Sequence, residues 1–139
     1  MAPGDRGIAR HEACAVPFRF RDQRLEFCLV SAEGSSRWEF PHATIAEHET
    51  AEQAARRCVT DFAELISLPG NSLPLDDLTT TQNGRQVRIT VFLLQVDSAD
   101  VAKDGRRIRW CFAEEARARI RRKPMRRLID LALRRQTES

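Results

Sequence analysis

What the 139-residue sequence lacks excludes several classes of protein. It contains no run of about 18 uncharged apolar residues, so a membrane-spanning helix is not expected. The N-terminal stretch 1–13 is polar and lacks the apolar middle of a signal peptide, which predicts a cytoplasmic protein. The six glycines are scattered and support no phosphate-cradling loop, and no Ser/His/Asp arrangement is visible.

Close pairs of metal-binding cysteines are also lacking. The sequence has four cysteines, Cys14, Cys28, Cys58 and Cys111, and none of them forms a CxxC pair. Zinc sites need ligands at close spacing, whereas each of these cysteines lies alone in an apolar segment. We therefore expect four buried, reduced thiols.

The length and composition suit one compact domain. An apolar content of 42% is sufficient for a hydrophobic core in a chain of this size. The sequence shows neither internal repeats nor low-complexity linkers. We expect a flexible tail at residues 1–12 and a single domain at residues 13–139.

Charge is distributed unevenly along the chain. Residues 1–102 hold 10 Lys/Arg and 15 Asp/Glu, whereas residues 103–139 hold 13 Lys/Arg and 5 Asp/Glu. This split indicates either an anionic partner near the C-terminal part or a solvated basic surface. Nucleic acid is one candidate partner, with phosphate contacts from Arg119, Arg121, Arg122, Lys123, Arg126 and Arg127. However, no aromatic residue follows Phe112, so base stacking has no platform there.

Apolar stretches separated by turn signals predict a mixed sheet with helices packed on it. Asn83-Gly84 is a strong hairpin signal, because both central residues of such a turn need a positive φ. The residues 85–96 that follow are apolar enough for a central strand. We expect strands at 14–20, 24–31, 37–40, 78–82, 85–96 and 108–112, loops at 71–77 and 97–107, and helices at 50–66, 113–122 and from Pro124 onward.

The helix expected at 50–66 carries a wide apolar face. Thr50 and Gln53 form a capping box at its start. At 100° per residue, the apolar side chains fill an unbroken arc that includes Cys58 and Phe62. Asp61 falls at the edge of this arc. Cys58 and Phe62 are therefore expected to be packing residues.

The residues around this helix resemble the box motif of Nudix hydrolases. Trp38, Phe40 and Pro41 precede the box, and the spacing of the box fits without a gap. A later segment, WCFAEEA at 110–116, resembles the entry to that family's late helix. The likeness covers roughly residues 13–135 and implies an α/β (α+β) Nudix fold, with a mixed β-sheet sandwiched between α-helices. The matching box positions are Glu49, Arg57, Val59, Asp61 and Leu65, and the departures are Ala43 for Gly, Cys58 for Glu, Phe62 for Glu and Glu64 for Gly.

The resemblance implies hydrolysis of a pyrophosphate linkage in a nucleoside diphosphate derivative, assisted by Mg²⁺ or Mn²⁺. The cation would neutralise the phosphates and acidify the attacking water, and hard cations prefer oxygen ligands. Of the trio that the box places on one helix face, Cys58 and Phe62 offer no hard ligand. Glu49 and Asp61 remain as candidate metal ligands, and Glu49, Arg57 and Asp61 as candidate catalytic residues. Any metal ion is expected to bind weakly.

Other candidate site residues lie close to the box. Trp38 and His42 are candidate substrate-binding residues, with His42 facing a phosphate. Arg57 either orients a box carboxylate, as in the family, or pairs with Asp61 one turn along the helix. Further acids that could assist a metal or act as a base are Glu47, Glu64, Asp97, Asp100 and Asp104.

Three functions remain open at this point. The interpretation we favour is a Nudix-like domain with weak or no pyrophosphatase activity, which binds a nucleotide or a protein partner in the substrate cleft. The alternative is an active Mg- or Mn-dependent pyrophosphohydrolase that uses a reduced ligand set. The second alternative is nucleic-acid binding through the basic C-terminal segment. A homodimer is also compatible with the resemblance.

Overall fold

The structure, a computed structural model, describes residues 8–31, 35–63, 67–96 and 107–138. It contains six strands and three helices in these ranges. In chain order they are β1 (Ile8–Arg21), β2 (Arg24–Ser31), β3 (His42–Thr44), α1 (Ala51–Ala63), β4 (Ser67–Gln82), β5 (Arg85–Val96), β6 (Arg107–Phe112), α2 (Ala113–Arg119) and α3 (Lys123–Glu138).

The central strand of the six-stranded mixed sheet is β1. The strand order is β4-β5-β1-β2-β6, and β3 pairs with the first half of β1. β1 runs parallel to β5 and antiparallel to β2 and β3. Strands in a parallel pair are usually buried on both faces, which accounts for the long apolar runs in β1 and β5.

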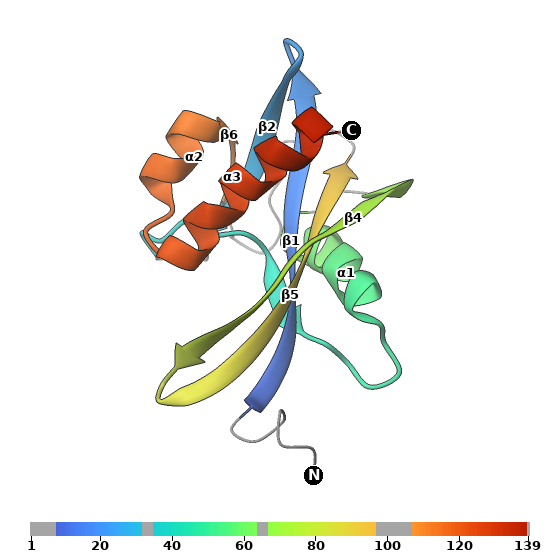
Figure 1. The fold of residues 1–139 in the computed structure, drawn as a ribbon, viewed down its shortest axis with the longest axis vertical. Coiled ribbons are helices and arrows are strands. Elements are labelled where there is room, and N and C mark those ends of the chain that lie inside the picture. Colours follow the sequence, from blue (N-terminus) through green and yellow to red (C-terminus); the bar gives the residue numbers. More distant parts are fainter. Residues whose placement is uncertain (1–7, 32–34, 64–66, 97–106, 139) are drawn as a thin grey trace.

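Helices cover both faces of this sheet. Successive residues of a strand point to opposite faces, so Cys14 and Val16 of β1 pack in one cluster with residues of α2 and α3. Ala13 and Ala15 pack in a second cluster with residues of α1. Figure 1 shows α3 crossing in front of the sheet and α1 lying behind it. The expected sheet sandwiched between helices is confirmed.

The local sequence signals are realised as predicted. The Gln53 N–H donates to Thr50 Oγ1 at 3.1 Å, and the Thr50 N–H donates to Gln53 Oε1 at 2.8 Å, which completes the capping box at the start of α1. Asn83 and Gly84 have φ values of 52° and 76° and join β4 to β5. All four cysteines are buried and free of disulfides.

The N-terminal tail is shorter than expected. β1 begins at Ile8, because β5 provides backbone partners as far as Gln86, which lies opposite Ile8. Residues 8–12 therefore belong to the sheet rather than to a tail at 1–12. Residues 1–7 lie outside the described residues.

The loop expected at 71–77 is wrong. β4 continues through this segment, with Leu73 opposite Leu93 and Pro74 opposite Phe92. Pro74 is tolerated because β4 is an edge strand with irregular register at this point. The helix expected at 113–122 ends at Arg119, and residues 37–40 contribute only an isolated bridge to β2. Most of the loop expected at 97–107 lies outside the described residues.

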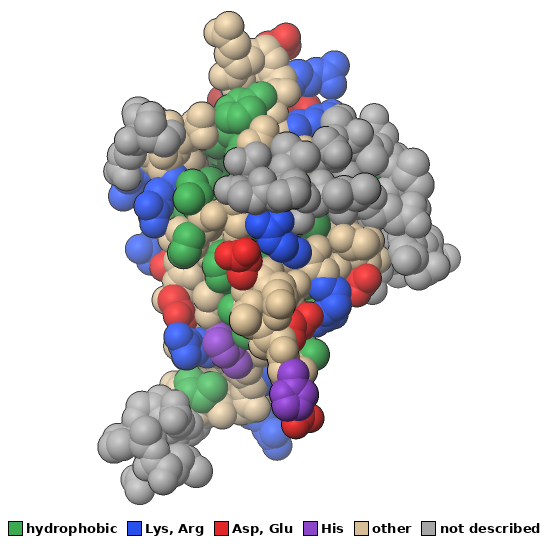
Figure 2. Space-filling view, turned by 90° about the vertical axis from the view of Figure 1, so that its right-hand side faces the viewer, with side chains coloured by type: hydrophobic (Ala, Val, Ile, Leu, Met, Phe, Trp, Pro, Cys, Tyr) green, Lys and Arg blue, Asp and Glu red, His purple; other side chains and the backbone are tan. Residues whose placement is uncertain are grey.

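None of the helices that the structure describes is long and apolar enough to cross a membrane. Figure 2 shows Lys/Arg and Asp/Glu side chains interspersed over the visible described part of one face. Some basic residues of the C-terminal segment lie beside the segment that precedes β3.

Candidate functional site

Helix α1 packs its apolar arc against the sheet. Ala54, Ala55, Cys58 and Val59 have no exposed surface. Burial raises the pKa of the Cys58 thiol to about 12, so it stays neutral at physiological pH. The expectation that Cys58 is a packing residue is confirmed. Phe62 lies on the same helix, but its side chain is outside the described residues.

Arg57 binds Glu49 through two hydrogen bonds. Its Nε and Nη2 atoms donate to Glu49 Oε2 and Oε1 at 2.8 and 3.0 Å, and the Ala46 N–H donates to Glu49 Oε1 at 2.9 Å. The bonds from Arg57 and, to a lesser extent, from Ala46 lower the pKa of Glu49 to about 2. The bond with Glu49 raises the pKa of Arg57. Both oxygens of Glu49 are thus engaged within the protein.

The remaining acids near α1 do not converge. Asp61 lies 3.7 Å from Arg57, and its side chain is half-exposed. The side chain of Glu47 is almost fully exposed beside His48. The other acids considered as metal or base candidates lie outside the described residues, namely Glu64, Asp97, Asp100 and Asp104.

The described side chains do not fit a divalent cation on α1. Mg²⁺ prefers octahedral oxygen coordination, often with one or two carboxylates. Cys58 is buried and soft, and of the two candidate ligands Glu49 is held by Arg57, while Asp61 is half-exposed. In the described part of the chain, no three or more His, Cys, Asp or Glu side chains group in a metal-binding arrangement.

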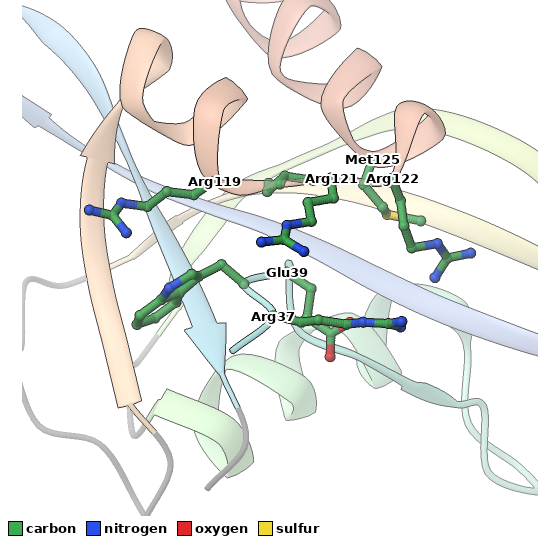
Figure 3. A pocket seen from close by; sticks show the side chains of 8 residues that line it. Arg37, Glu39, Arg119, Arg121, Arg122 and Met125 are labelled. Atoms are coloured by element: carbon green, nitrogen blue, oxygen red, sulfur yellow. The ribbon is translucent and has the colours of Figure 1, made fainter. Parts of the chain in front are cut away.

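The structure also contains a basic pocket, whose described lining residues lie outside α1. It has a volume of about 360 Å³, which lies within the range of small-molecule sites. One wall is the segment before β3, and the other is the connection from α2 to α3 (Figure 3). The lining residues are Arg37, Trp38, Glu39, Arg119, Ile120, Arg121, Arg122 and Met125.

Three of the four pocket arginines form no ion pair with a described acid. Arg119 Nε donates to Glu115 Oε2 at 2.7 Å, and Arg122 Nη2 lies 3.4 Å from Thr80 Oγ1. Arg37 and Arg121 form no side-chain ion pair with any described residue. Figure 3 shows Arg121 directed from the α2–α3 connection into the space above Glu39. Unpaired guanidinium groups beside a cavity favour the binding of an anion, above all a phosphate.

His42 bridges two glutamates behind the pocket. Its Nδ1 lies 3.2 Å from Glu12 Oε1, and its Nε2 lies 3.5 Å from Glu39 Oε2. Glu12 is only 5% exposed, and its other oxygen lies 2.8 Å from Arg10 Nε. The contacts with Glu12 and then Glu39 raise the pKa of His42 to about 9, so His42 is an imidazolium ion at neutral pH. Both nitrogens of His42 face carboxylates in this arrangement, and the expectation that His42 faces a phosphate stays a prediction.

This histidine predicts a specific loss of stability at alkaline pH. A histidine with a folded pKa above the unfolded value stabilises fully below about pH 6.5, and this contribution is lost as pH rises through about 9. We expect the free energy of unfolding of the wild type to exceed that of His42→Gln by about 1–3 kcal/mol at pH 6, with a smaller difference at pH 9.5.

Urea unfolding of both proteins at a series of pH values measures this difference. The thiols of the unfolded chain ionise above about pH 8.5 in both proteins, so their effect cancels in the comparison. A difference between the two proteins that is independent of pH would show that His42 is not charged in the folded state.

The structure divides the basic C-terminal segment into two groups. Arg119, Arg121 and Arg122 line the pocket beside the segment before β3. Lys123, Arg126 and Arg127 line a separate shallow hollow on α3, with Arg117 and Asp130. Nucleic-acid binding stays a prediction that the structure does not test.

Of the three pocket residues before β3, the sequence indicated only Trp38 as a candidate for binding. Trp38 was expected to contact substrate, and the structure places it in the pocket wall. Arg37 and Glu39, which flank Trp38 in the sequence, were not considered as binding residues. Their neighbours in the pocket come from more than 80 residues further along the chain, and no local signal indicates that contact.

Comparisons with known proteins concern the fold. No protein-family model matches the sequence, and no curated protein matches it significantly. Among solved structures, the NUDIX domain of Shewanella oneidensis NrtR complexed with ADP ribose is 16% identical, with a TM-score of 0.75 over 98% of this chain and 94% of that chain.

Two further solved structures agree with this similarity. A C. elegans Ap4A hydrolase is 20% identical, with a TM-score of 0.71 over 89% of this chain and 96% of that chain. A NUDIX hydrolase from Nitrosomonas europaea is 21% identical, with a TM-score of 0.72 over 88% and 87% of the two chains. Together with the mixed sheet and the helix that carries the box motif, these similarities show that the chain has the Nudix fold.

Proposed function

We propose that this protein binds a nucleoside diphosphate derivative in the arginine-lined pocket and has little or no pyrophosphatase activity. The observation that carries the proposal is the contrast between two surfaces. The metal-binding face of the Nudix helix is closed by the buried Cys58 and by the Arg57–Glu49 pair. The pocket between the segment before β3 and the α2–α3 connection is open, and its described lining carries four arginines and one glutamate.

The pocket has the chemistry that a diphosphate needs. Guanidinium groups bind phosphate oxygens through paired, charge-assisted hydrogen bonds. Arg37 and Arg121 are available for this, because no described acid holds them. Trp38, Ile120 and Met125 supply apolar surface to the same pocket, and this surface suits the nucleoside part of a ligand. The structural neighbours are consistent with such a ligand, since one is complexed with ADP ribose and another is an Ap4A hydrolase.

Efficient hydrolysis is disfavoured by the same geometry. Attack of water on a diphosphate requires neutralised phosphate oxygens and an activated water. The arginines can supply the first, but no described carboxylate near α1 is both free and placed beside a second one to supply the rest. Asp61 alone is a weak candidate for either role.

Binding and turnover can be measured on the same preparation. ADP, ADP-ribose and diadenosine tetraphosphate are titrated by calorimetry, and product release is followed by chromatography with Mg²⁺ or Mn²⁺ present. We expect binding of at least one of these ligands without catalytic turnover. Metal-dependent turnover that is lost in Asp61→Ala would instead establish the pyrophosphohydrolase. An absence of both binding and turnover would reject the proposal.

A further inference from the structure

We propose that Glu39 is the specificity-determining residue of the pocket, accepting a hydrogen bond from the non-phosphate part of the ligand, and that His42 is its positioning residue. This inference rests on the proposed function, since it concerns the same pocket. It assigns the ligand class as a phosphate-bearing nucleoside with an O–H or N–H donor, as opposed to a phosphate group alone.

The backbone of Glu39 is fixed in place by β2. The Glu39 N–H donates to the Val30 carbonyl at 3.0 Å, and the Val30 N–H donates to the Glu39 carbonyl at 2.8 Å. The neighbouring Phe40 is fully buried in the core. The side chain of Glu39 therefore leaves the backbone from a rigid point, and Glu39 lines the pocket on the side opposite the α2–α3 connection (Figure 3).

The carboxylate of Glu39 is also positioned by a contact with His42. His42 lies 3.5 Å from Oε2, and His42 is itself anchored on the buried Glu12. The side chain of Glu39 is 42% exposed, and no hydrogen bond to Oε1 is present among the described residues. One oxygen is thus positioned by His42, while no described residue donates a hydrogen bond to the other.

Glu39 is the single acid among the residues that line this pocket. The arginines offer only donors, so an arginine pocket alone would bind any phosphate. Contact with His42 lowers the pKa of Glu39, which keeps it ionised at neutral pH and therefore able only to accept hydrogen bonds. A negative charge at this position repels phosphate. It becomes favourable for a ligand that also brings a donor, such as a ribose hydroxyl or an exocyclic amine.

The test compares Glu39→Gln with the wild type on two ligands, ADP and inorganic pyrophosphate. The proposal predicts effects of opposite sign. Affinity for ADP falls about tenfold, because a charge-assisted hydrogen bond is lost. Affinity for pyrophosphate is unchanged or increases, because a repulsive charge is removed. Glutamine is close to glutamate in size, and circular dichroism checks that the variant is folded.

The role of His42 is tested by His42→Gln on the same two ligands. The charge of Glu39 is retained in this variant, but its anchor is altered. We expect weaker ADP binding with little change for pyrophosphate. A parallel change for both ligands would show that His42 acts on the pocket as a whole and not through Glu39.

Two analogues distinguish the sources of the donor. The wild type and Glu39→Gln are each titrated with two analogues. One is 2′,3′-dideoxy-ADP, which lacks the ribose hydroxyls, and the other is IDP, which lacks the exocyclic amine. The analogue whose affinity is insensitive to Glu39→Gln identifies the group that Glu39 binds. If Glu39→Gln tightens ADP and pyrophosphate alike, the inference fails while the proposed function stands. If the wild type binds neither ADP nor pyrophosphate, the proposed function itself fails.

Discussion

Replacement of Cys58 by glutamate is expected to destabilise the protein by about 3–5 kcal/mol, without creating a metal site. The same substitution would restore an acid of the Nudix box. Cys58 has no exposed surface, and its neighbours Ala54, Ala55 and Val59 are equally buried. A carboxylate there either loses its hydration or forces α1 away from the sheet. Both outcomes lower the free energy of unfolding, which urea titration measures.

Thr60→Glu is the matched control for this substitution. It adds the same charge to the same helix at an exposed position, so its expected effect on stability is within about 0.5 kcal/mol. Millimolar Mg²⁺ or Mn²⁺ should raise the melting temperature of neither variant. If Cys58→Glu were as stable as Thr60→Glu and were stabilised by metal, the closed face described for α1 would be incorrect.

Removal of two pocket arginines should have the largest effect on binding. In the double variant Arg37→Gln with Arg121→Gln, the affinity for ADP is expected to fall about 100-fold, since each guanidinium contributes a charge-assisted bond to phosphate. Neither arginine forms an ion pair with a described acid, so their loss leaves no buried carboxylate unpaired. Stability should therefore change little.

Arg21→Gln provides the control, because Arg21 is exposed at the end of β1 and is not among the pocket residues. It removes the same type of charge and should leave ADP affinity within about twofold. Higher salt should weaken the wild type more than the double variant. Equal affinities for the double variant and the control would show that ADP does not bind in this pocket.

Features that depend on neighbouring residues in the sequence were predictable. The capping box at Thr50 and Gln53 forms because its groups are three residues apart, and the turn at Asn83-Gly84 forms because its residues tolerate a positive φ. The burial of Cys58 followed from the 3.6-residue period of the helix. In each case the relevant physical interaction lies within a few residues.

Features that depend on strand pairing were not predictable. Glu12 meets His42 because β3 pairs with β1 and places Cys14 opposite His42. The sequence left open whether Arg57 orients a box carboxylate or pairs with Asp61. In the structure it binds Glu49 most closely, because the segment before α1 folds back along the helix.

The pocket itself shows why tertiary contacts limited the prediction. Its arginines come from the segment before β3 and from the α2–α3 connection, which only the folded sheet brings together. Read along the sequence, Arg121 belongs to a basic run that suggested nucleic acid. In the structure it lies across from Glu39, apart from Lys123, Arg126 and Arg127 on α3.

The central claim is that guanidinium groups of the arginine-lined pocket bind the diphosphate without a metal ion. One titration tests this claim most directly. ADP binding to the wild type is measured by calorimetry in EDTA and again in excess Mg²⁺. The arginine pocket predicts that ADP binds in EDTA at least as tightly as in Mg²⁺, because the free diphosphate carries more negative charge for the guanidinium groups. Binding that appears only when Mg²⁺ is present would contradict this account.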